Sequence, residues 1–279
     1  MKKIGYYNGE IGPIEDVKVP MLDRALYFAD GCYDASMLKN GAVHNEDAHF
    51  DRFWNSARLL KIDLSFTREE LHNEIQRMVD VYDGDDGFIY WQVSRGTALR
   101  NHAFPKGAKP NLMMMLVESG TTSTSKEYKC ITVEDKRFRF CNIKTLNLLP
   151  NCIAYQQGLD VDANEIIFVR DGYVTEMAHS NVSFLVDGTF VYHPFDDKIL
   201  PGISMKNIIA ECKKLGIPTE ARALSQVEAM NADELICSSS STFACRITEV
   251  DGIPVGGKDP ELFKRIQDAV YAEYETCGK

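Results

Sequence analysis

One lysine, Lys144, lies in the apolar and small polar segment Phe140–Leu149, with no Asp or Glu within five positions. If this segment is a strand, its alternation places Lys144 on the face opposite Ile143 and Thr145, and the apolar neighbours favour a cavity over water. A lysine without water loses its charge more easily and becomes a nucleophile, as Schiff-base chemistry requires. The segment alone also fits a lysine that reaches solvent from a strand edge, and this alternative stays open.

Two other stretches suit a phosphate group. In Leu200–Ser204, backbone amides at a helix start, a glycine and a serine hydroxyl together form an anion site. In Cys237–Thr242, four consecutive serines follow the predicted strand Glu234–Ile236 and offer hydroxyls and amides. Each stretch has a simpler interpretation, an ordinary N-cap by Ser204 and a plain polar loop. Neither contains the G-x-x-x-x-G-K-[ST] signature of a P-loop.

Two further groups carry charge. The loop Arg95–His102 is basic in an acidic protein, and Arg100 offers a planar fork for a carboxylate, with His102 two residues on. A solvated basic turn is the alternative. Glu176 follows the predicted strand Tyr173–Thr175 and, taken alone, indicates an exposed glutamate at a strand end. No G-x-S-x-G elbow, H-E-x-x-H helix or histidine cluster predicts a serine hydrolase or a metal site.

The elements that must position these residues include many antiparallel strands. Asn-Gly and Asp-Gly pairs between apolar runs are a strong hairpin signal, because a type I′ turn needs positive φ at both central residues. They predict five hairpins, at Asn8-Gly9, Asn40-Gly41, Asp171-Gly172, Asp187-Gly188 and Asp251-Gly252. Apolar periodicity predicts helices over Asp47–Leu60, Thr67–Tyr82, about Asn151–Gly158, Ser204–Leu215 and Pro260–Thr276. Other strands are predicted at Phe88–Ser94, Asn111–Val117, Lys129–Glu134 and around Lys144.

This mixture of elements predicts an α+β protein. The polar segment Glu118–Glu127 has no periodicity and separates two parts of the chain. We therefore expect a small α/β N-terminal domain over residues 1–118, a linker over 119–127 and a larger, β-rich domain over 128–279.

Charge and composition narrow the function classes. The chain has 279 residues, a formal charge of −10 and a pI near 5.2, which argue against a nucleic-acid surface. Its longest apolar run, Leu112–Val117, is far too short to span a membrane. Eight cysteines without a C-x-x-C pair, and an N-terminus without an apolar signal sequence, indicate a cytoplasmic protein with reduced thiols.

The order of these groups resembles that of the class IV, or fold-type IV, aminotransferases, and most closely their bacterial D-amino acid branch. The similarity covers nearly the whole chain. Its segments, in the family's order, are Asp23–Tyr33, His49–Arg52, Tyr90–Thr97, Arg100–His102, Ile143–Leu149, Val174–Glu176 with Ser180–Val182, Leu200–Ile203, and Asp233–Leu235 with the serine run.

The resemblance implies a two-domain enzyme that depends on pyridoxal 5′-phosphate. It would transfer an amino group between a D-amino acid, such as D-alanine or D-glutamate, and a 2-oxo acid by a ping-pong route. Lys144 would then bind the cofactor as a Schiff base and move the substrate proton. Glu176 would face the pyridine nitrogen and keep the ring protonated, so that the ring could accept electrons.

The same resemblance implies two binding sites. Arg52 would bind the cofactor phosphate, together with amides and hydroxyls of Ile203, Ser204, Ser239 and Ser240. Tyr33, Arg100 and His102 would bind the substrate α-carboxylate, and Arg100 and His102 are expected from the partner subunit of a homodimer.

The sequence departs from the D-amino acid branch at two places. Met177-Ala178-His179 stands where small serines follow the glutamate, and Pro150 stands where a glycine is expected. Both bear on substrate choice and on the D or L preference more than on reaction type.

A branched-chain L-aminotransferase and an aminodeoxychorismate lyase share the lysine, glutamate and phosphate site, so both remain alternatives. A non-catalytic pyridoxal-phosphate or anion-binding protein would not need Glu176 or Tyr33, and a cysteine-dependent hydrolase lacks a histidine partner at motif spacing.

Overall fold

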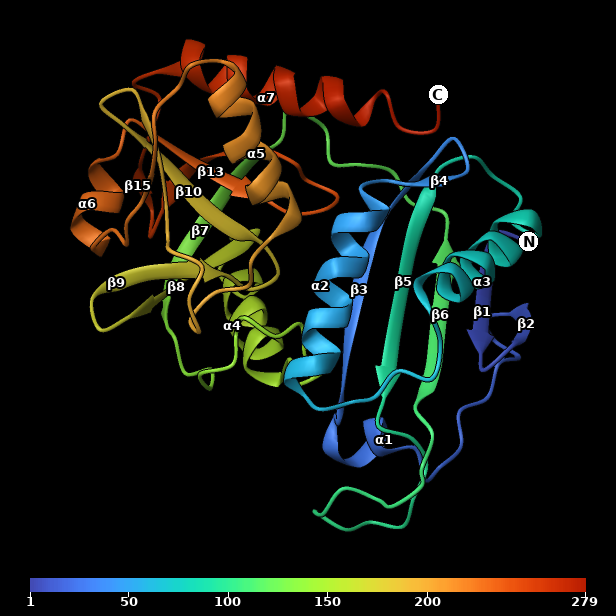
Figure 1. Ribbon diagram of the computed structural model, residues 1–279. Helices are drawn as coiled ribbons and strands as arrows, with labels where there is room; N and C mark the ends of the chain where they lie inside the picture. The colour runs from blue at the N-terminus through green and yellow to red at the C-terminus, as the bar shows by residue number, and fades with distance from the viewer. The chain divides into compact units, whose positions relative to one another are not determined.

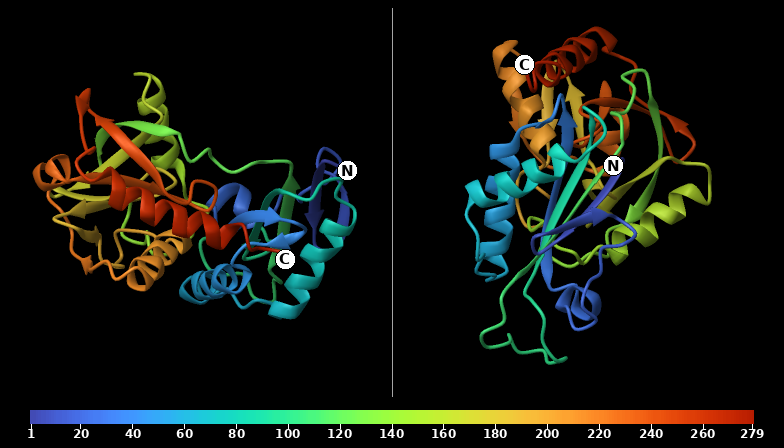
Figure 2. Two further views of the ribbon diagram at one scale, coloured as in Figure 1. Left: turned by 90° about the horizontal axis from the view of Figure 1, so that it is seen from above. Right: turned by 90° about the vertical axis from the view of Figure 1, so that its right-hand side faces the viewer.

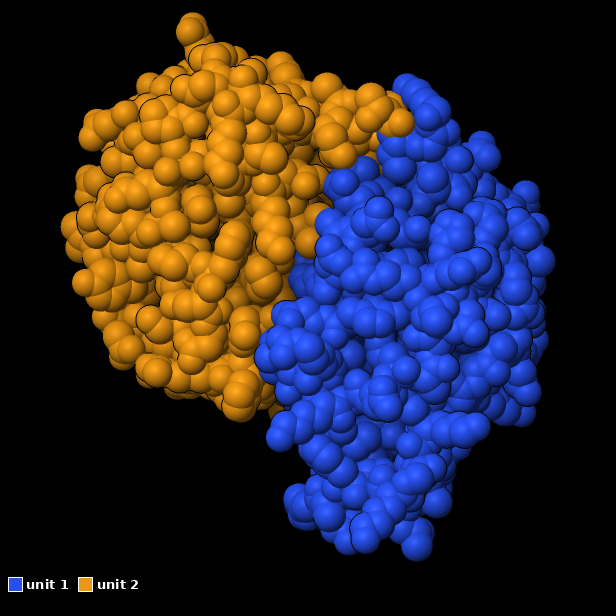
Figure 3. All heavy atoms as spheres, viewed as in Figure 1, with its two compact units in different colours: residues 1–120, 143–147, 277–279 blue, residues 121–142, 148–276 orange.

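The computed structural model describes all 279 residues and divides into two compact units. Unit 1 comprises residues 1–120, 143–147 and 277–279, and unit 2 comprises residues 121–142 and 148–276 (Figure 3). The first division falls inside the predicted linker. The short segment around Lys144 belongs to unit 1, whereas the sequence led us to expect a single change of domain along the chain.

Unit 1 is built on a six-stranded antiparallel sheet with the strand order β2-β1-β6-β5-β3-β4 (Figure 1). The helices α2 and α3 both cover one face of this sheet (Figure 2), where Phe53 and Trp91 are fully buried. The strands are β1 (Lys3–Tyr7), β2 (Glu10–Pro13), β3 (Gly31–Lys39), β4 (Ala42–Val43), β5 (Gly87–Ser94) and β6 (Asn111–Val117). The helices are α1 (Arg24–Phe28), α2 (Glu46–Leu59) and α3 (Arg68–Asp80).

Unit 2 is built on a nine-stranded mixed sheet with the order β12-β11-β10-β13-β14-β7-β8-β9, and β15 pairs with β14. Its strands are β7 (Glu127–Glu134), β8 (Glu165–Arg170), β9 (Tyr173–Met177), β10 (Asn181–Val186), β11 (Thr189–Tyr192), β12 (Thr219–Ala221), β13 (Glu234–Ser238), β14 (Cys245–Val250) and β15 (Ile253–Pro254). Its helices are α4 (Leu149–Leu159), α5 (Ile203–Lys214), α6 (Gln226–Asn231) and α7 (Pro260–Tyr274). None of the helices in either unit combines the length and the apolar character that a bilayer crossing requires.

Local sequence signals account for many of these elements. All five predicted hairpins are confirmed, and each of their ten turn residues has positive φ. The predicted start of α3 is also confirmed, because Thr67 and Glu70 form a capping box.

The predicted strand around Lys144 is wrong. Residues 141–147 form an irregular segment with one isolated bridge, between Thr145 and Cys32. The Lys144 carbonyl accepts from the Tyr33 amide at 2.9 Å, but its own amide donates to the Ser56 hydroxyl at 3.2 Å. Because that donor is used by a side chain, the segment cannot continue a strand ladder.

Candidate active site

Lys144 lies beside an aromatic pair in unit 1. Its Nζ is 4.4 Å from the centroid of the Tyr33 ring, an attractive cation–π contact, and it makes no ion pair. Tyr33 stacks on Tyr90 at 5.2 Å, and the Tyr90 hydroxyl donates to Gln92 at 2.8 Å. The lysine side chain is half-buried rather than enclosed in an apolar cavity, as the sequence had led us to expect. A positive group therefore lies on an aromatic face with no carboxylate to fix it.

Arg52 is oriented by a buried carboxylate. Its Nε and Nη2 donate to Asp34 on β3 at 2.9 and 2.7 Å, and His49 Nδ1 lies 2.7 Å from the same carboxylate. Burial alone would raise the pKa of Asp34, but the positive charge of Arg52 and the contact with His49 hold that pKa well below its usual range. Burial lowers the pKa of His49, and the charges of Arg52 and Lys144 lower it further, whereas Asp34 opposes this. The charges of both Arg52 and Lys144 therefore act on the His49 ring.

Arg100 and His102 share one aromatic partner. Both are exposed on the loop between β5 and β6, which extends past α1 (Figure 1). The Arg100 guanidinium carbon is 5.0 Å from the centroid of the Phe28 ring, and the His102 ring centroid is 5.1 Å from it. The structure joins neither residue to Tyr33 by a hydrogen bond or a ring contact. The predicted carboxylate site is therefore present in one chain as two separate parts.

Glu176 is buried inside β9, so the expectation of an exposed glutamate at a strand end is wrong. Arg137 donates to its Oε1, and Oε2 accepts from Asn181 Nδ2 at 3.1 Å and from the Leu200 amide at 3.0 Å. Burial raises the pKa of Glu176, and the charge and hydrogen bond of Arg137 oppose that rise. A carboxylate accepts about four hydrogen bonds, so this one retains capacity for a further donor.

The start of α5 offers backbone donors. Its N-cap is Gly202, not Ser204, and no side chain caps the helix. Ser204 is buried, and its hydroxyl donates to the Ser239 carbonyl at 2.8 Å, which ties the first turn of α5 to the serine run. The Ser239 hydroxyl accepts from the Thr242 amide at 3.2 Å. The amides of the first turn, including that of Ile203, therefore suit an anion.

Comparison with known proteins identifies the family of the chain. The sequence profile of the amino-transferase class IV family matches residues 31–250. The chain belongs to the class IV aminotransferases. Its relatives include D-alanine aminotransferases of Bacillus licheniformis, 33% identical over 95% of this chain and 94% of the relative, and of Staphylococcus epidermidis, 37% identical over 88% and 89%.

Solved structures show the same fold. The Escherichia coli branched-chain amino acid aminotransferase superposes with a TM-score of 0.88 at 22% identity, covering 96% of this chain and 93% of that one. The branched-chain enzyme of Thermoproteus uzoniensis, solved with norvaline, superposes with a TM-score of 0.88 at 20% identity, covering 98% and 96%. Another branched-chain enzyme of this fold is solved with pyridoxamine 5′-phosphate. The predicted fold class, a fold-type IV aminotransferase, is thereby confirmed. At these identities the structures establish the fold alone.

Sequence reasoning about this class IV aminotransferase missed three residues that hold the site. Arg137 and Asn181 bind Glu176, and Asp34 orients Arg52. Arg137 lies in the basic stretch Lys136–Arg139, which signals charge but not a partner. Asn181 was part of a matched segment, but only the folded chain shows what its amide binds.

The two departing positions have local roles in unit 2. His179 Nδ1 lies 2.9 Å from the fully buried Glu165 carboxylate, and its ring contacts Tyr155 edge-on at 5.1 Å. Pro150 occupies the first turn of α4, where its missing N–H has no cost.

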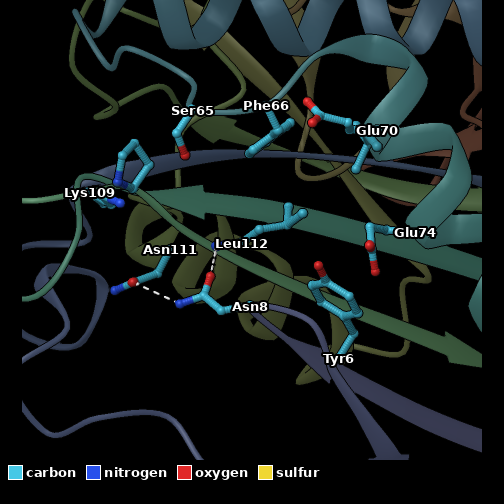
Figure 4. A pocket seen from close by; sticks show the side chains of 11 residues that line it. Tyr6, Asn8, Ser65, Phe66, Glu70, Glu74, Lys109, Asn111 and Leu112 are labelled. Carbon is cyan, nitrogen blue, oxygen red and sulfur yellow. Dashed lines mark hydrogen bonds between the residues drawn. The ribbon is translucent and has the colours of Figure 1, made fainter.

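A separate pocket in unit 1 takes no part in this site. It has a volume of about 440 Å³ and is lined by residues that include Tyr6, Asn8 and Asn111 (Figure 4). Asn8 and Asn111 bond to each other at 3.0 Å, and Asn8 also accepts from the Leu112 amide at 2.8 Å. None of the predicted site residues lines this pocket.

Proposed function

We propose that this class IV aminotransferase transfers an amino group between a D-amino acid, such as D-alanine, and a 2-oxo acid. The observation that carries the proposal is its identity of 33 to 37% to several D-alanine aminotransferases, which extends over 88 to 96% of the chain. A branched-chain L-aminotransferase is the second candidate, and solved enzymes of that kind share this fold. An aminodeoxychorismate lyase is a third, and it has no need of a carboxylate site at Arg100.

The residues of unit 2 fit pyridoxal 5′-phosphate. When bound, this cofactor supplies an electron-accepting ring that stabilises negative charge at the substrate Cα. Glu176, with acceptor capacity left, would hold a proton on the ring nitrogen. The amides of Ile203 and Ser204 at the uncapped start of α5 would bind the phosphate, with Ser239 and Ser240 beside them. We propose unit 2 as the principal cofactor-binding domain.

Unit 1 would supply the reactive amine and the remaining charges. Lys144 has no ion pair to break, so its amine is available to bind the cofactor and to carry a proton to and from the substrate Cα. Arg52, held by Asp34, would bind the phosphate. Tyr33, next to Lys144, would contact the substrate carboxylate.

We also propose a homodimer in which Arg100 and His102 serve the partner's substrate site. The face of the unit 1 sheet that α2 and α3 leave uncovered carries the half-buried Tyr90, Met113 and Met115. Such a face of an antiparallel sheet is usually polar when it meets water. On the same loop as Arg100, the side chain of Leu99 is 78% exposed. A second copy would cover this apolar surface. A cytoplasmic location remains a prediction.

The proposed reaction is tested with purified protein and added pyridoxal 5′-phosphate. D-alanine and L-leucine are each supplied with 2-oxoglutarate, and pyruvate or glutamate is followed by a coupled assay. We expect D-alanine to be the better donor by at least tenfold in kcat/KM. A preference for L-leucine would favour the branched-chain alternative, and transfer from neither donor would overturn the proposal.

A further inference from the structure

A buried arginine holds the loop that carries Arg100 and His102. Arg24, at the start of α1, is only 3% exposed. Its Nη1 donates to the Asn101 carbonyl at 2.7 Å, and its Nε donates to Asp30 at 2.7 Å. Asn101 is the residue between Arg100 and His102, so the bond fixes the backbone midway between them. Two of the N–H groups of Arg24 are thus bound within the chain, and one of these two bonds holds the loop.

The Phe28 ring provides a second attachment. The Arg24 guanidinium carbon lies 4.7 Å from the ring centroid, and Arg100 and His102 contact the same ring. Exposed arginine side chains otherwise sample many rotamers, which costs binding free energy when they are ordered. A ring shared with a buried arginine restricts that freedom before a substrate arrives.

Asp30 connects Arg24 to the other end of the loop. Arg95 Nε donates to Asp30 at 2.9 Å, and its Nη1 and Nη2 donate to the carbonyls of Lys61 and Leu60, each at 2.8 Å. Arg24 and Arg95 thus share the Asp30 carboxylate, whereas no carboxylate pairs with Arg100 on the same loop. The unpaired guanidinium of Arg100 suits an anionic group of a ligand.

We infer that Arg24 is a positioning residue for the substrate carboxylate, because it sets where Arg100 and His102 lie. The inference rests on the proposed function, since it requires Arg100 to bind the α-carboxylate. It predicts that affinity for carboxylate substrates depends on a residue that does not touch them.

The test compares KM and kcat for D-alanine in the loaded enzyme and in the variants Arg24→Met, Arg100→Ala and the double variant. We expect Arg24→Met to raise KM roughly tenfold and to change kcat by less than about twofold. In the Arg100→Ala background, Arg24→Met should raise KM by less than about twofold, because Arg100 no longer contributes to carboxylate binding. Arg246→Met is the matched control, since Arg246 pairs with the buried Glu234 in unit 2 and contacts none of these residues. It should lower the melting temperature without changing KM.

An unchanged KM in Arg24→Met would overturn the inference. So would an Arg24→Met substitution that raises KM equally in the wild-type and the Arg100→Ala background. If Arg24→Met fails to fold, Arg24→Lys keeps a charge beside Asp30, and its KM should shift in the same direction. Failure of the proposed function gives a different result. If the wild type prefers L-leucine, KM and kcat of the same three variants are measured with L-leucine, which also carries an α-carboxylate. If Arg100→Ala leaves KM unchanged, the proposed carboxylate site is wrong and the inference falls with it.

Discussion

Arg137 donates to Glu176 from one end of its guanidinium group and to Asp135 at 2.9 Å from the other. Asp135 is itself bound by Arg170 at 2.9 Å. The charge of the buried Glu176 is therefore supported by a residue whose own position is fixed by an ion-pair network. Without Arg137, burial would favour the neutral acid.

Arg137→Met should shift the activity of the enzyme to higher pH. Loss of the guanidinium raises the pKa of Glu176 further, so the carboxylate that we propose faces the ring nitrogen forms only at higher pH. We expect kcat at pH 7 to fall at least tenfold, with partial recovery toward pH 9, in a pH profile of kcat. Arg170→Met, which removes a contact of Asp135 but none of Glu176, should give a smaller shift. Superimposable profiles of Arg137→Met and wild type would contradict this account.

Lys144→Ala should remove the covalent attachment of the cofactor. We expect loss of the visible absorbance of the protein-bound cofactor and a fall in turnover by several orders of magnitude. Absorbance spectra after gel filtration and the coupled assay measure the two effects. Lys129→Ala, which removes a lysine paired with Glu249, is the control and should change neither. Retained activity with unchanged cofactor binding would show that the lysine is misassigned.

Gly202→Ala should weaken cofactor binding. An added Cβ would collide with Oδ1 of Asn181, whose amide also donates to Glu176. The clash must displace the start of α5, Asn181 or both, at a cost of about 1–3 kcal/mol. A titration with pyridoxal 5′-phosphate should show at least tenfold weaker binding, whereas Gly12→Ala, with open space around its Cβ, should bind normally. Equal affinities would mean that this close approach does not matter.

Mixed dimers should show whether Arg100 acts on the partner's site. A dimer of one Lys144→Ala chain and one Arg100→Ala chain holds one complete site only if Arg100 acts across the interface. Random 1:1 mixing after mild dissociation should then restore about a quarter of the wild-type activity, because half of the dimers are mixed. If Arg100 acts within its own chain, no complete site exists and activity stays at the level of the separate variants.

Acid should destabilise the protein through His49 and Asp34. Folding lowers the pKa of His49, so below about pH 6.5 the unfolded chain binds a proton that the folded chain does not. The free energy of unfolding therefore decreases as the pH decreases. Asp34 has a lowered pKa, so its contribution is present at neutral pH and is lost only below about pH 3.9. Urea unfolding between pH 8 and pH 4.5 should show a flatter dependence for His49→Gln. His72→Gln, an exposed control, should keep the wild-type slope.

The sequence predicted the structural features that depend on residues close together in the chain. Asn-Gly and Asp-Gly turns and the Thr67/Glu70 cap depend on a few adjacent residues, and all appear where expected. It did not predict the features that depend on contacts between residues far apart in the chain. The Lys144 segment is irregular because its amide binds Ser56, 88 positions away, and Glu176 is buried against Arg137, 39 positions away. Family resemblance predicts a functional role for Glu176, but only the folded chain shows which residues bind its carboxylate.

The stretch from Leu200 to Ser204 binds Glu176 with its first amide and the serine run with its last hydroxyl. One short piece of backbone thus fixes the spacing between Glu176 and the helix start that we propose binds the phosphate. A ligand that must satisfy both ends is selected by its length, and a vitamer without its phosphate would leave one end unfilled.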